Sequence, residues 1–327
     1  MGHGAPDWSR TARERTFTRE DRPSQTVFVG RGLHPSMDPR SFTIRESRDS
    51  PEHLRSRAIT FVLDVTRSMG DIPHALATRT LPDLGIRVER IFPDAQFQIM
   101  GIGDAEEADR APLQVGQWET VGNLVDEALT RLFLEEGGGR IGEESYDLGM
   151  YVLARCSHTD CWEERREPGY AFFTGDEKPR HRVSAAVVNR VFGKQMLDAD
   201  IPIQQVVAEA SEKFRVFFLV PDLRRAEECA AAWNTLLGEH VIHMEHPDDT
   251  AIIAAELIML TEGMAPNLDD TFERLIKDGI EREVVKRVYR ALRPYAMTLG
   301  ALPRLRDVSE CRMLPSTRPS GLRSLRA

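Results

Sequence analysis

Short continuous apolar runs alternate along the chain with longer segments whose apolar residues recur at helical spacing. The continuous runs predict strands buried on both faces, at residues 58–65, 95–105, 169–177 and 215–222. Helical spacing predicts helices at residues 71–92, 120–136, 145–156, 184–195, 203–214, 224–239 and 249–263. Such an alternation predicts an α/β, doubly wound (Rossmann-like) fold, with a mostly parallel sheet and helices on both faces.

Weaker patterns complete the outline of the fold. Residues 111–119 alternate in polarity and predict an edge strand, and residues 240–245 predict a short strand. Within the first helical segment, Asp71 is the expected cap, and Pro82 is expected to kink or split the helix. Trp118 and Trp233 are interpreted as packing residues rather than recognition anchors.

The flanks of the alternating region have a different composition. We expect a disordered arm at residues 1–25 and a disordered tail at 303–327, because both are polar and rich in arginine. Residues 26–54 are predicted to hold a short strand within 25–33 and a charged connector. The connector includes "RESRDS", read as solvated or salt-bridged. The main domain is placed at 55–262. Two C-terminal helices are placed at 263–302, and their membership in the same core is left open.

Charge and cysteine content narrow the functional classes. The formal net charge is -9 and the isoelectric point is about 5.6, which speaks against nucleic-acid binding. No apolar run approaches the 18 residues of a membrane span, and the N-terminal segment lacks the apolar core of a secretory signal. Four cysteines in such a chain predict reduced thiols and a cytoplasmic location. The cluster "CSHTDC" at 156–161 lacks a second ligand pair for zinc, so plain thiols are preferred.

Polar side chains follow the predicted strands at the points where the strands end. Asp64, Thr66 and Ser68 follow the first, Asp104 the second and Asp176 the third, while Glu144 and Ser145 end a glycine-rich loop that begins at Gly137. In an open parallel sheet, ligands bind at the carboxyl ends of the strands. Carboxylates and hydroxyls without paired histidine or cysteine favour a hard cation such as Mg²⁺, Mn²⁺ or Ca²⁺.

The spacing Asp64-x-Thr66-x-Ser68 after a buried strand resembles the Asp-x-Ser/Thr-x-Ser signature of von Willebrand factor type A (VWA) domains. In that family the signature forms the metal-ion-dependent adhesion site (MIDAS). The resemblance extends to "FFTGDE" at 172–177 and to the glycine-rich loop, and it covers roughly residues 55–262. The later elements look like a bacterial intracellular branch of the family.

The resemblance implies a role for each site residue. Thr66 and Ser68 would bind the metal through their hydroxyls, Asp64 would hold a metal-bound water, and Asp176 would act through water. The sequence departs from the family in two places. The family's third hydroxyl, usually threonine, is missing, and Glu144 or Ser145 stands nearest to its place. The order Gly175-Asp176 also reverses the usual Asp-Gly.

These implications favour a metal-dependent protein-binding module that engages an acidic residue of a protein partner. Mg²⁺ is the expected ion, with Mn²⁺ or Ca²⁺ as alternatives, and no enzyme activity is expected. One alternative is a metal-dependent phosphohydrolase, but the haloacid dehalogenase type needs a second aspartate where Thr66 stands, and no phosphate-binding loop is present. The others are a scaffold with a degenerate site, or an ordinary turn capped by Asp64. Asp104 is read as a helix cap or loop residue, or as part of the metal edge.

Overall fold

The computed structural model describes residues 27–301 except for residues 29, 70, 71, 107, 108, 136–142 and 222. The side chains of residues 68, 78, 79, 81, 82 and 224–228 are not described. The predicted disordered arm and tail therefore lie outside the described residues. So do the expected cap Asp71 and the glycines of the glycine-rich loop.

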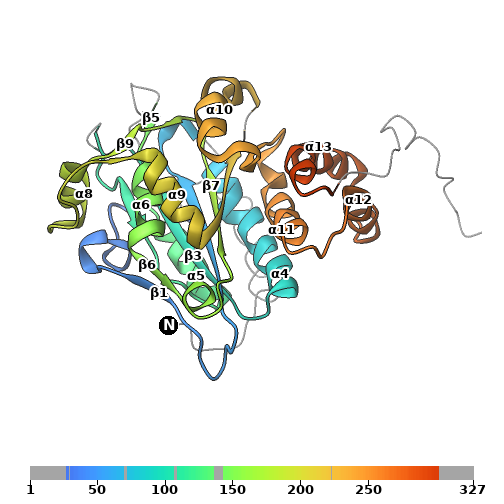
Figure 1. Ribbon diagram of the computed structural model, residues 1–327, viewed down its shortest axis with the longest axis horizontal. Coiled ribbons are helices and arrows are strands. Elements are labelled where there is room, and N and C mark those ends of the chain that lie inside the picture. The colour runs from blue at the N-terminus through green and yellow to red at the C-terminus, as the bar shows by residue number, and fades with distance from the viewer. Residues whose placement is uncertain are drawn as a thin grey trace, which may run out of the picture.

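A six-stranded sheet forms the centre of the fold (Figure 1). Its strands are β2 (Arg57–Asp64), β3 (Ala95–Ile102), β4 (Leu113–Val115), β7 (Gly169–Thr174), β11 (Phe214–Val220) and β12 (Val241–His243). They lie in the order β12-β11-β7-β2-β3-β4. All neighbours are parallel except β3 and β4, which are antiparallel. The predicted doubly wound α/β fold is confirmed, and so is the predicted edge strand.

The strand order places one crevice at the middle of the sheet. The chain starts at β2, adds β3 and β4 on one side, and then returns to add β7, β11 and β12 on the other. The order reverses between β2 and β7, and crevices of this kind at the carboxyl ends of strands hold ligands in open α/β sheets. Asp64 lies one residue beyond the Leu63–Thr174 pair that joins the two strands. The first predicted strand therefore ends at this crevice.

Helices cover both faces of the sheet because successive strand residues point in opposite directions. On β2, Ile59, Phe61 and Leu63 belong to one core cluster, while Ala58 and Val62 belong to the other. The first cluster includes residues of α4 (Leu81–Ile91), α5 (Gly122–Thr130), α11 (Thr250–Thr261), α12 (Leu268–Lys277) and α13 (Arg282–Thr298). The second includes residues of α6 (Tyr146–Arg155), α8 (Ala185–Phe192), α9 (Ile203–Lys213) and α10 (Leu223–Leu237). Trp118 and Trp233 are fully buried in the second cluster, as their reading as packing residues predicts.

The helix after β2 is split, as the position of Pro82 predicts. A short helix α3 (Ile72–Ala75) runs into a π-helical turn at Leu76–Thr80, and α4 then begins at Leu81. Proline has no backbone N–H, so a carbonyl one turn before it loses its usual donor. The Thr80 hydroxyl donates to the Ala75 carbonyl over 3.4 Å, which supplies one donor within the wider turn.

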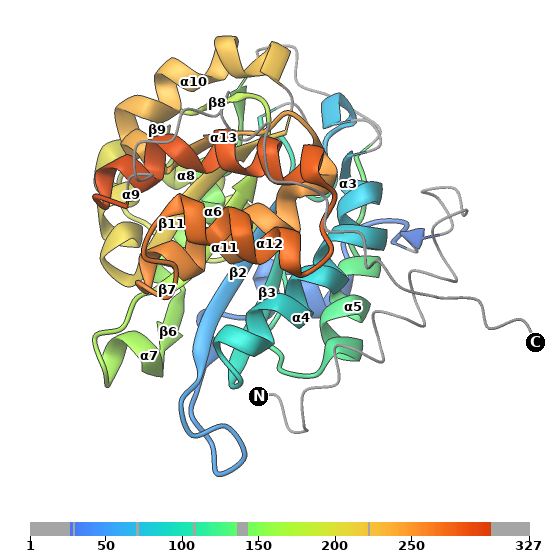
Figure 2. The ribbon, with the colours of Figure 1, turned by 90° about the vertical axis from the view of Figure 1, so that its right-hand side faces the viewer.

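The C-terminal helices belong to the main core, which the sequence left open. Figure 2 shows α11, α12 and α13 together on one side of the sheet. Tyr295 of α13 packs edge-on against Phe217 of β11, with ring centroids 5.0 Å apart. Arg287 donates two hydrogen bonds, of 2.7 and 2.8 Å, to the buried carboxylate of Asp249. An apolar contact therefore joins α13 to the sheet, and a bidentate ion pair joins it to the turn before α11.

The segment before β2 differs from the prediction in one respect. A short strand was predicted within residues 25–33, but the described residues of this range form none. Val27 and Phe28 are instead buried in the core. A Cβ on Gly30 would lie 2.7 Å from the Arg131 carbonyl oxygen, so this stretch packs closely against the backbone that follows α5.

The charged connector is salt-bridged, as one reading of "RESRDS" predicts. Its strand β1 (Arg45–Ser47) pairs in parallel with β6 (Ser157–Thr159), which precedes the short helix α7 (Asp160–Glu163). Arg48 forms ion pairs with Asp160 at 2.6 Å and with Glu163 at 2.9 Å. Two further two-stranded sheets pair β5 (Glu143–Glu144) with β8 (Lys178–Pro179), and β9 (Arg182–Val183) with β10 (Ile201–Pro202).

The cysteines of the described region are free thiols. Cys156, Cys161 and Cys229 are all buried, and burial raises the pKa of Cys156 to about 12. Asp160 of the "CSHTDC" cluster is paired with Arg48, and no metal-holding group of His, Cys, Asp or Glu is found there or elsewhere in the described part of the chain. Among the described helices, none combines the length and the apolar character needed to cross a membrane.

Candidate metal site

Asp64 ends β2 as a buried carboxylate that is held by hydrogen bonds from both sides. Its Oδ1 atom accepts from the backbone N–H of Thr66 at 2.9 Å and from the Thr66 hydroxyl at 2.6 Å. Its Oδ2 atom accepts from the hydroxyl of Tyr146 at 2.5 Å. These three donors occupy three of the roughly four acceptor positions of a carboxylate. One position is left for a further donor such as water.

Tyr146 is the partner of Asp64 that the sequence did not reveal. Its ring is fully buried and packs edge-on against Phe218 and Trp233, with centroids 5.3 and 5.5 Å away. A Cβ at Gly175 would overlap the hydroxyl and ring of Tyr146. Glycine is therefore needed at position 175, and the acidic residue stands at 176. Tyr146 thus gives a steric reason for the reversed Gly-Asp order.

Glu144 faces this group with one carboxylate oxygen that has no partner. The residue is buried at the end of β5, and its Oε2 atom has no hydrogen-bond partner. Burial first of all, and then the nearby carboxylates of Asp64, Asp104, Asp109 and Glu177, raise the pKa of Glu144 to about 9. A buried, unpaired acceptor surrounded by like charges costs free energy unless a cation or proton joins it.

Ser145, the other candidate for the missing ligand, is committed elsewhere. Its hydroxyl oxygen accepts a 2.9 Å hydrogen bond from the backbone N–H of Ala105. Its own backbone N–H donates to the Gly103 carbonyl at 3.3 Å. Both bonds tie Ser145 to the loop after β3. Ser145 is therefore held at this loop, while Glu144 interacts electrostatically with Asp64.

The remaining candidates lie at the same edge of the sheet. Thr66 is buried next to Asp64, and because its proton is donated to Asp64, its oxygen presents lone pairs. Ser68 lies in the 3-10 turn Arg67–Met69, and its side chain is outside the described set. Asp176 is buried two residues beyond the end of β7. Thr66 and Asp176 thus each follow the carboxyl end of one of the two neighbouring strands, β2 and β7.

Asp104 is a loop residue that is paired with an arginine the sequence did not single out. Its Oδ1 atom accepts from Arg180 at 2.6 Å and from the Glu106 N–H at 2.8 Å, while its Oδ2 atom has no partner. Arg180 also bonds to Glu106 at 2.9 Å. The loop reading of Asp104 agrees with the structure, since no helix begins at the described residues that follow it. Arg180 offsets part of the negative charge on this side of Glu144.

The donor set fits a hard cation coordinated partly by neutral oxygens. Within the described ranges, no three His, Cys, Asp or Glu side chains group so that they alone could hold a metal ion. The edge instead offers the Thr66 hydroxyl, the unpartnered Glu144 oxygen and the remaining acceptor position of Asp64. Mixed hydroxyl and carboxylate oxygens suit Mg²⁺, Mn²⁺ or Ca²⁺.

Comparisons with known proteins show only remote likeness. No family model and no curated protein matches the chain. A pilus adhesin, SpaC from Lactobacillus rhamnosus GG, is 10% identical with a TM-score of 0.44, over 66% of this chain and 31% of the adhesin chain. This chain thus spans about a third of that adhesin's length.

Two further solved structures are similarly remote. A von Willebrand factor type A protein from Catenulispora acidiphila is 13% identical, with a TM-score of 0.36, over 62% of this chain and 42% of its own. The VWA domain of SpRpn10 is 10% identical, with a TM-score of 0.35, over 61% and 94%. Values this low establish no family membership and assign no function.

The contact between Gly175 and Tyr146 gives a first prediction. Gly175→Ala should lower the free energy of unfolding by about 1–3 kcal/mol, because the new methyl group must displace a ring that is packed on its other sides. Urea unfolding measures the change. The control is Gly32→Ala, whose Cβ would lie 3.6 Å from the mobile end of Arg110 and should be nearly neutral. Equal stability of the two variants would show that Tyr146 does not depend on Gly175.

The unpartnered oxygen of Glu144 gives a second prediction. In EDTA at neutral pH, Glu144→Gln should raise the free energy of unfolding by about 1–3 kcal/mol, because a carboxyl with a pKa of about 9 must take up a proton on folding and the neutral amide need not. Millimolar Mg²⁺ should then stabilise the wild type more than the variant, because a ligand adds stability only where it binds. Denaturant unfolding with and without Mg²⁺ provides both numbers. A variant less stable than the wild type in EDTA would mean that Glu144 already has a partner.

Proposed function

We propose that this chain is a von Willebrand A-type protein-binding module that holds a divalent cation at the carboxyl edge of its sheet. Mg²⁺ is the ion we expect in the cell, with Thr66, Ser68 and Glu144 as ligands and Asp64 and Asp176 acting through water. The observation that carries the proposal is the buried Glu144 oxygen without a partner beside Asp64, at the crevice between β2 and β7.

The proposed ligands explain why the cation would take a further ligand from another protein. Hydroxyl ligands neutralise little of a divalent charge, so the ion would favour a carboxylate offered by a Glu or Asp of the partner. Glu144 would supply one negative charge and moderate that attraction. The cytoplasm is the proposed location, which accords with the free buried thiols of Cys156, Cys161 and Cys229.

The geometry of Asp64 supports binding over phosphoryl transfer. A nucleophilic aspartate needs an oxygen directed at the substrate, with a second acid or base beside it. Both oxygens of Asp64 accept hydrogen bonds from the protein, and position 66 offers a hydroxyl that is itself bonded to Asp64. Asp64 is therefore better suited to hold a water and orient the loop than to attack phosphorus.

Metal affinity in Thr66 variants tests the proposal. Thr66→Val should weaken Mn²⁺ binding by about tenfold or more, because the variant keeps the shape and loses the ligand oxygen; this corresponds to about 1.4 kcal/mol. Thr66→Ser should retain binding. Depletion of the free Mn²⁺ resonance in electron paramagnetic spectra measures both affinities. Thr60→Val is the matched control, since Thr60 is a buried β2 threonine whose hydroxyl bonds to Gln98 away from the site.

The open coordination position has its own test in the same samples. Acetate should displace water from the bound Mn²⁺ and lower the relaxation enhancement of water protons in the wild type. No change with acetate would show that the protein fills every position, and the binding-module proposal would then fail. Equal Mn²⁺ affinity in wild type and Thr66→Val would remove the metal site itself.

A further inference from the structure

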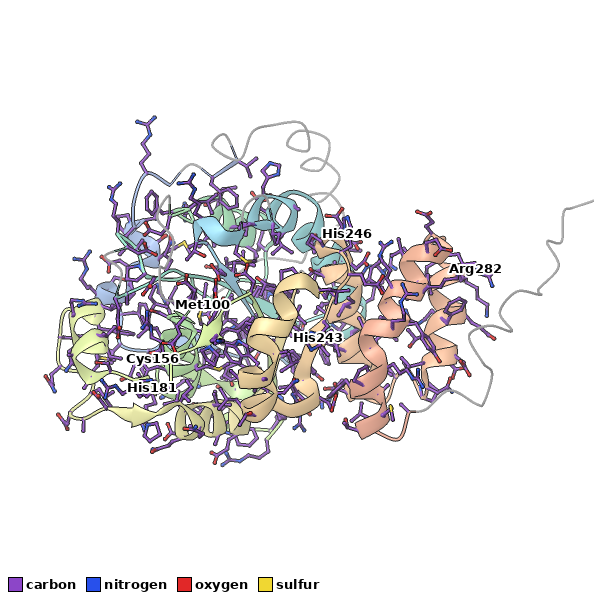
Figure 3. The ribbon with its side chains drawn as sticks, turned by 90° about the horizontal axis from the view of Figure 1, so that it is seen from above. Met100, Cys156, His181, His243, His246 and Arg282 are labelled. Carbon is purple, nitrogen blue, oxygen red and sulfur yellow. The ribbon has the colours of Figure 1, made fainter. Side chains whose placement is uncertain are left out.

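A small polar pocket lies beside the proposed metal edge and is distinct from it. It has a volume of about 160 Å³. Its lining residues include Glu143, Ser145, Asp147, Arg180, His181, Ser184 and Val187. Neither Asp64 nor Thr66 nor Glu144 is among them. Figure 3 labels His181, which lies on the opposite side of the molecule from Arg282 at the start of α13. The C-terminal helices therefore leave the pocket uncovered.

The strand β5 separates the pocket from the metal edge. Successive residues of a strand point to opposite sides. Glu144 is directed at the carboxylates around Asp64, and Glu143 lines the pocket, where its carboxylate lies 3.9 Å from Arg180. Glu143 thus belongs to the pocket, whereas its neighbour Glu144 belongs to the proposed metal edge.

Asp147 brings an unsatisfied carboxylate into this pocket. It stands in the first turn of α6 with only 2% of its surface exposed, and its Oδ1 atom has no hydrogen-bond partner. Burial raises the pKa of Asp147 to about 7, although Arg180 and the backbone N–H groups at the start of α6 act in the opposite direction. A buried polar atom without a partner in a pocket wall indicates that a ligand or water completes it.

The charges around the pocket leave Asp147 and Glu143 undercompensated. Arg180 has its two Nη atoms on Asp104 and Glu106, and its Nε atom is buried without a partner. Arg182 also lines the pocket, but its guanidinium lies 3.3 Å from the carboxylate of Asp200, which is not a lining residue. Within the described residues, no cation forms an ion pair with Asp147. A group that carries positive charge and several N–H donors matches this surplus of acceptors.

The size of the pocket restricts what it can hold. Sites for drug-sized ligands and cofactors occupy about 300–1,000 Å³. A pocket of about 160 Å³ is too small for a nucleotide, but it can take the end of one long side chain. Val187 adds an apolar wall against which the methylene stem of such a side chain can lie.

We propose that this pocket binds a cationic nitrogen group, the ammonium of a lysine or the guanidinium of an arginine, presented by the protein partner. The partner as the source rests on the proposed function, whereas the ligand chemistry rests on the pocket alone. Charge-assisted hydrogen bonds would run from the bound group to Asp147 and Glu143, with the hydroxyls of Ser145 and Ser184 beside them. A partner that gives a carboxylate to the metal and a basic side chain to this pocket is held at two points, which fixes its orientation.

Methyl NMR spectroscopy of the full chain tests the pocket without the metal. The Val187 methyl groups report binding while EDTA keeps the protein metal-free. The cationic probes are Nα-acetyl-lysine methylamide and Nα-acetyl-arginine methylamide, with the neutral Nα-acetyl-glutamine methylamide as control. Spermidine stands for a free polyamine. At least one cationic amino-acid probe should shift Val187 saturably, and the glutamine probe should not.

Substitutions of the two acidic residues test whether the cationic probe binds at Asp147 and Glu143. Asp147→Asn should weaken binding of the cationic probe by about tenfold, as loss of one charge-assisted hydrogen bond does, and Glu143→Gln should weaken it by a smaller factor. Glu212→Gln, an exposed glutamate on α9, should leave the affinity unchanged. If Asp147→Asn does not fold, the partly exposed Glu143→Gln decides the matter in its place.

Three results would overturn the inference. An unchanged Val187 signal with both basic probes would mean that water alone fills the pocket. Shifts with the glutamine probe as strong as those with the basic probes would mean that charge is not recognised. Tighter binding of spermidine than of either amino-acid probe would replace the partner side chain by a free polyamine. Because all titrations are made in EDTA, failure of the metal site would leave these outcomes readable, and the Mn²⁺ measurements are likewise independent of the pocket.

Discussion

The hydrogen-bonded position of Asp64 is the constraint on which the arrangement of the sheet edge depends. A carboxylate at the end of a central, fully buried strand can be kept only if donors surround it. Thr66 supplies two of them from the turn that follows the strand, and Tyr146 supplies the third from α6. This single group therefore ties the first loop to the helix on the other side of the crevice. Glycine at 175 follows from it, because the buried tyrosine leaves no room for a side chain there.

Acidic side chains are concentrated at the same edge of the sheet, and β5 separates them into two groups. On one side Glu144 meets Asp64, Asp104, Asp109 and Glu177, and its unpartnered oxygen gives the strongest reason to place a cation there. On the other side Glu143 and Asp147 line a pocket that Arg180 compensates only in part. One physical fact applies on both sides of β5: buried carboxylates without partners raise the free energy of the folded protein until a cation or a proton joins them.

The sequence predicted those features that depend on residues close together in the chain. Continuous apolar runs predicted the central parallel strands, and Pro82 predicted the split helix. The polar residues after the first strand pointed to Asp64 and Thr66, and the end of the glycine-rich loop pointed to Glu144. Contacts between segments that are far apart in the chain could not be predicted, because no pattern of neighbouring residues indicates them. Tyr146 reaches Asp64 across 82 positions, and Arg180 reaches Asp104 across 76. The apolar stretch around Val27 was predicted as a strand by pattern alone, but it packs in the core near the end of α5 instead. A helix pattern likewise could not show that α13 docks on β11 through Tyr295.

The most direct test of the metal site is anomalous diffraction from crystals of the full chain soaked in Mn²⁺. At a wavelength near the manganese edge, an anomalous peak reveals the ion independently of water or sodium. We expect a peak in the crevice between β2 and β7, within bonding distance of the Thr66 hydroxyl and of the Glu144 carboxylate. A soaked crystal with no peak at this edge, or with a peak that contacts neither residue, would contradict it.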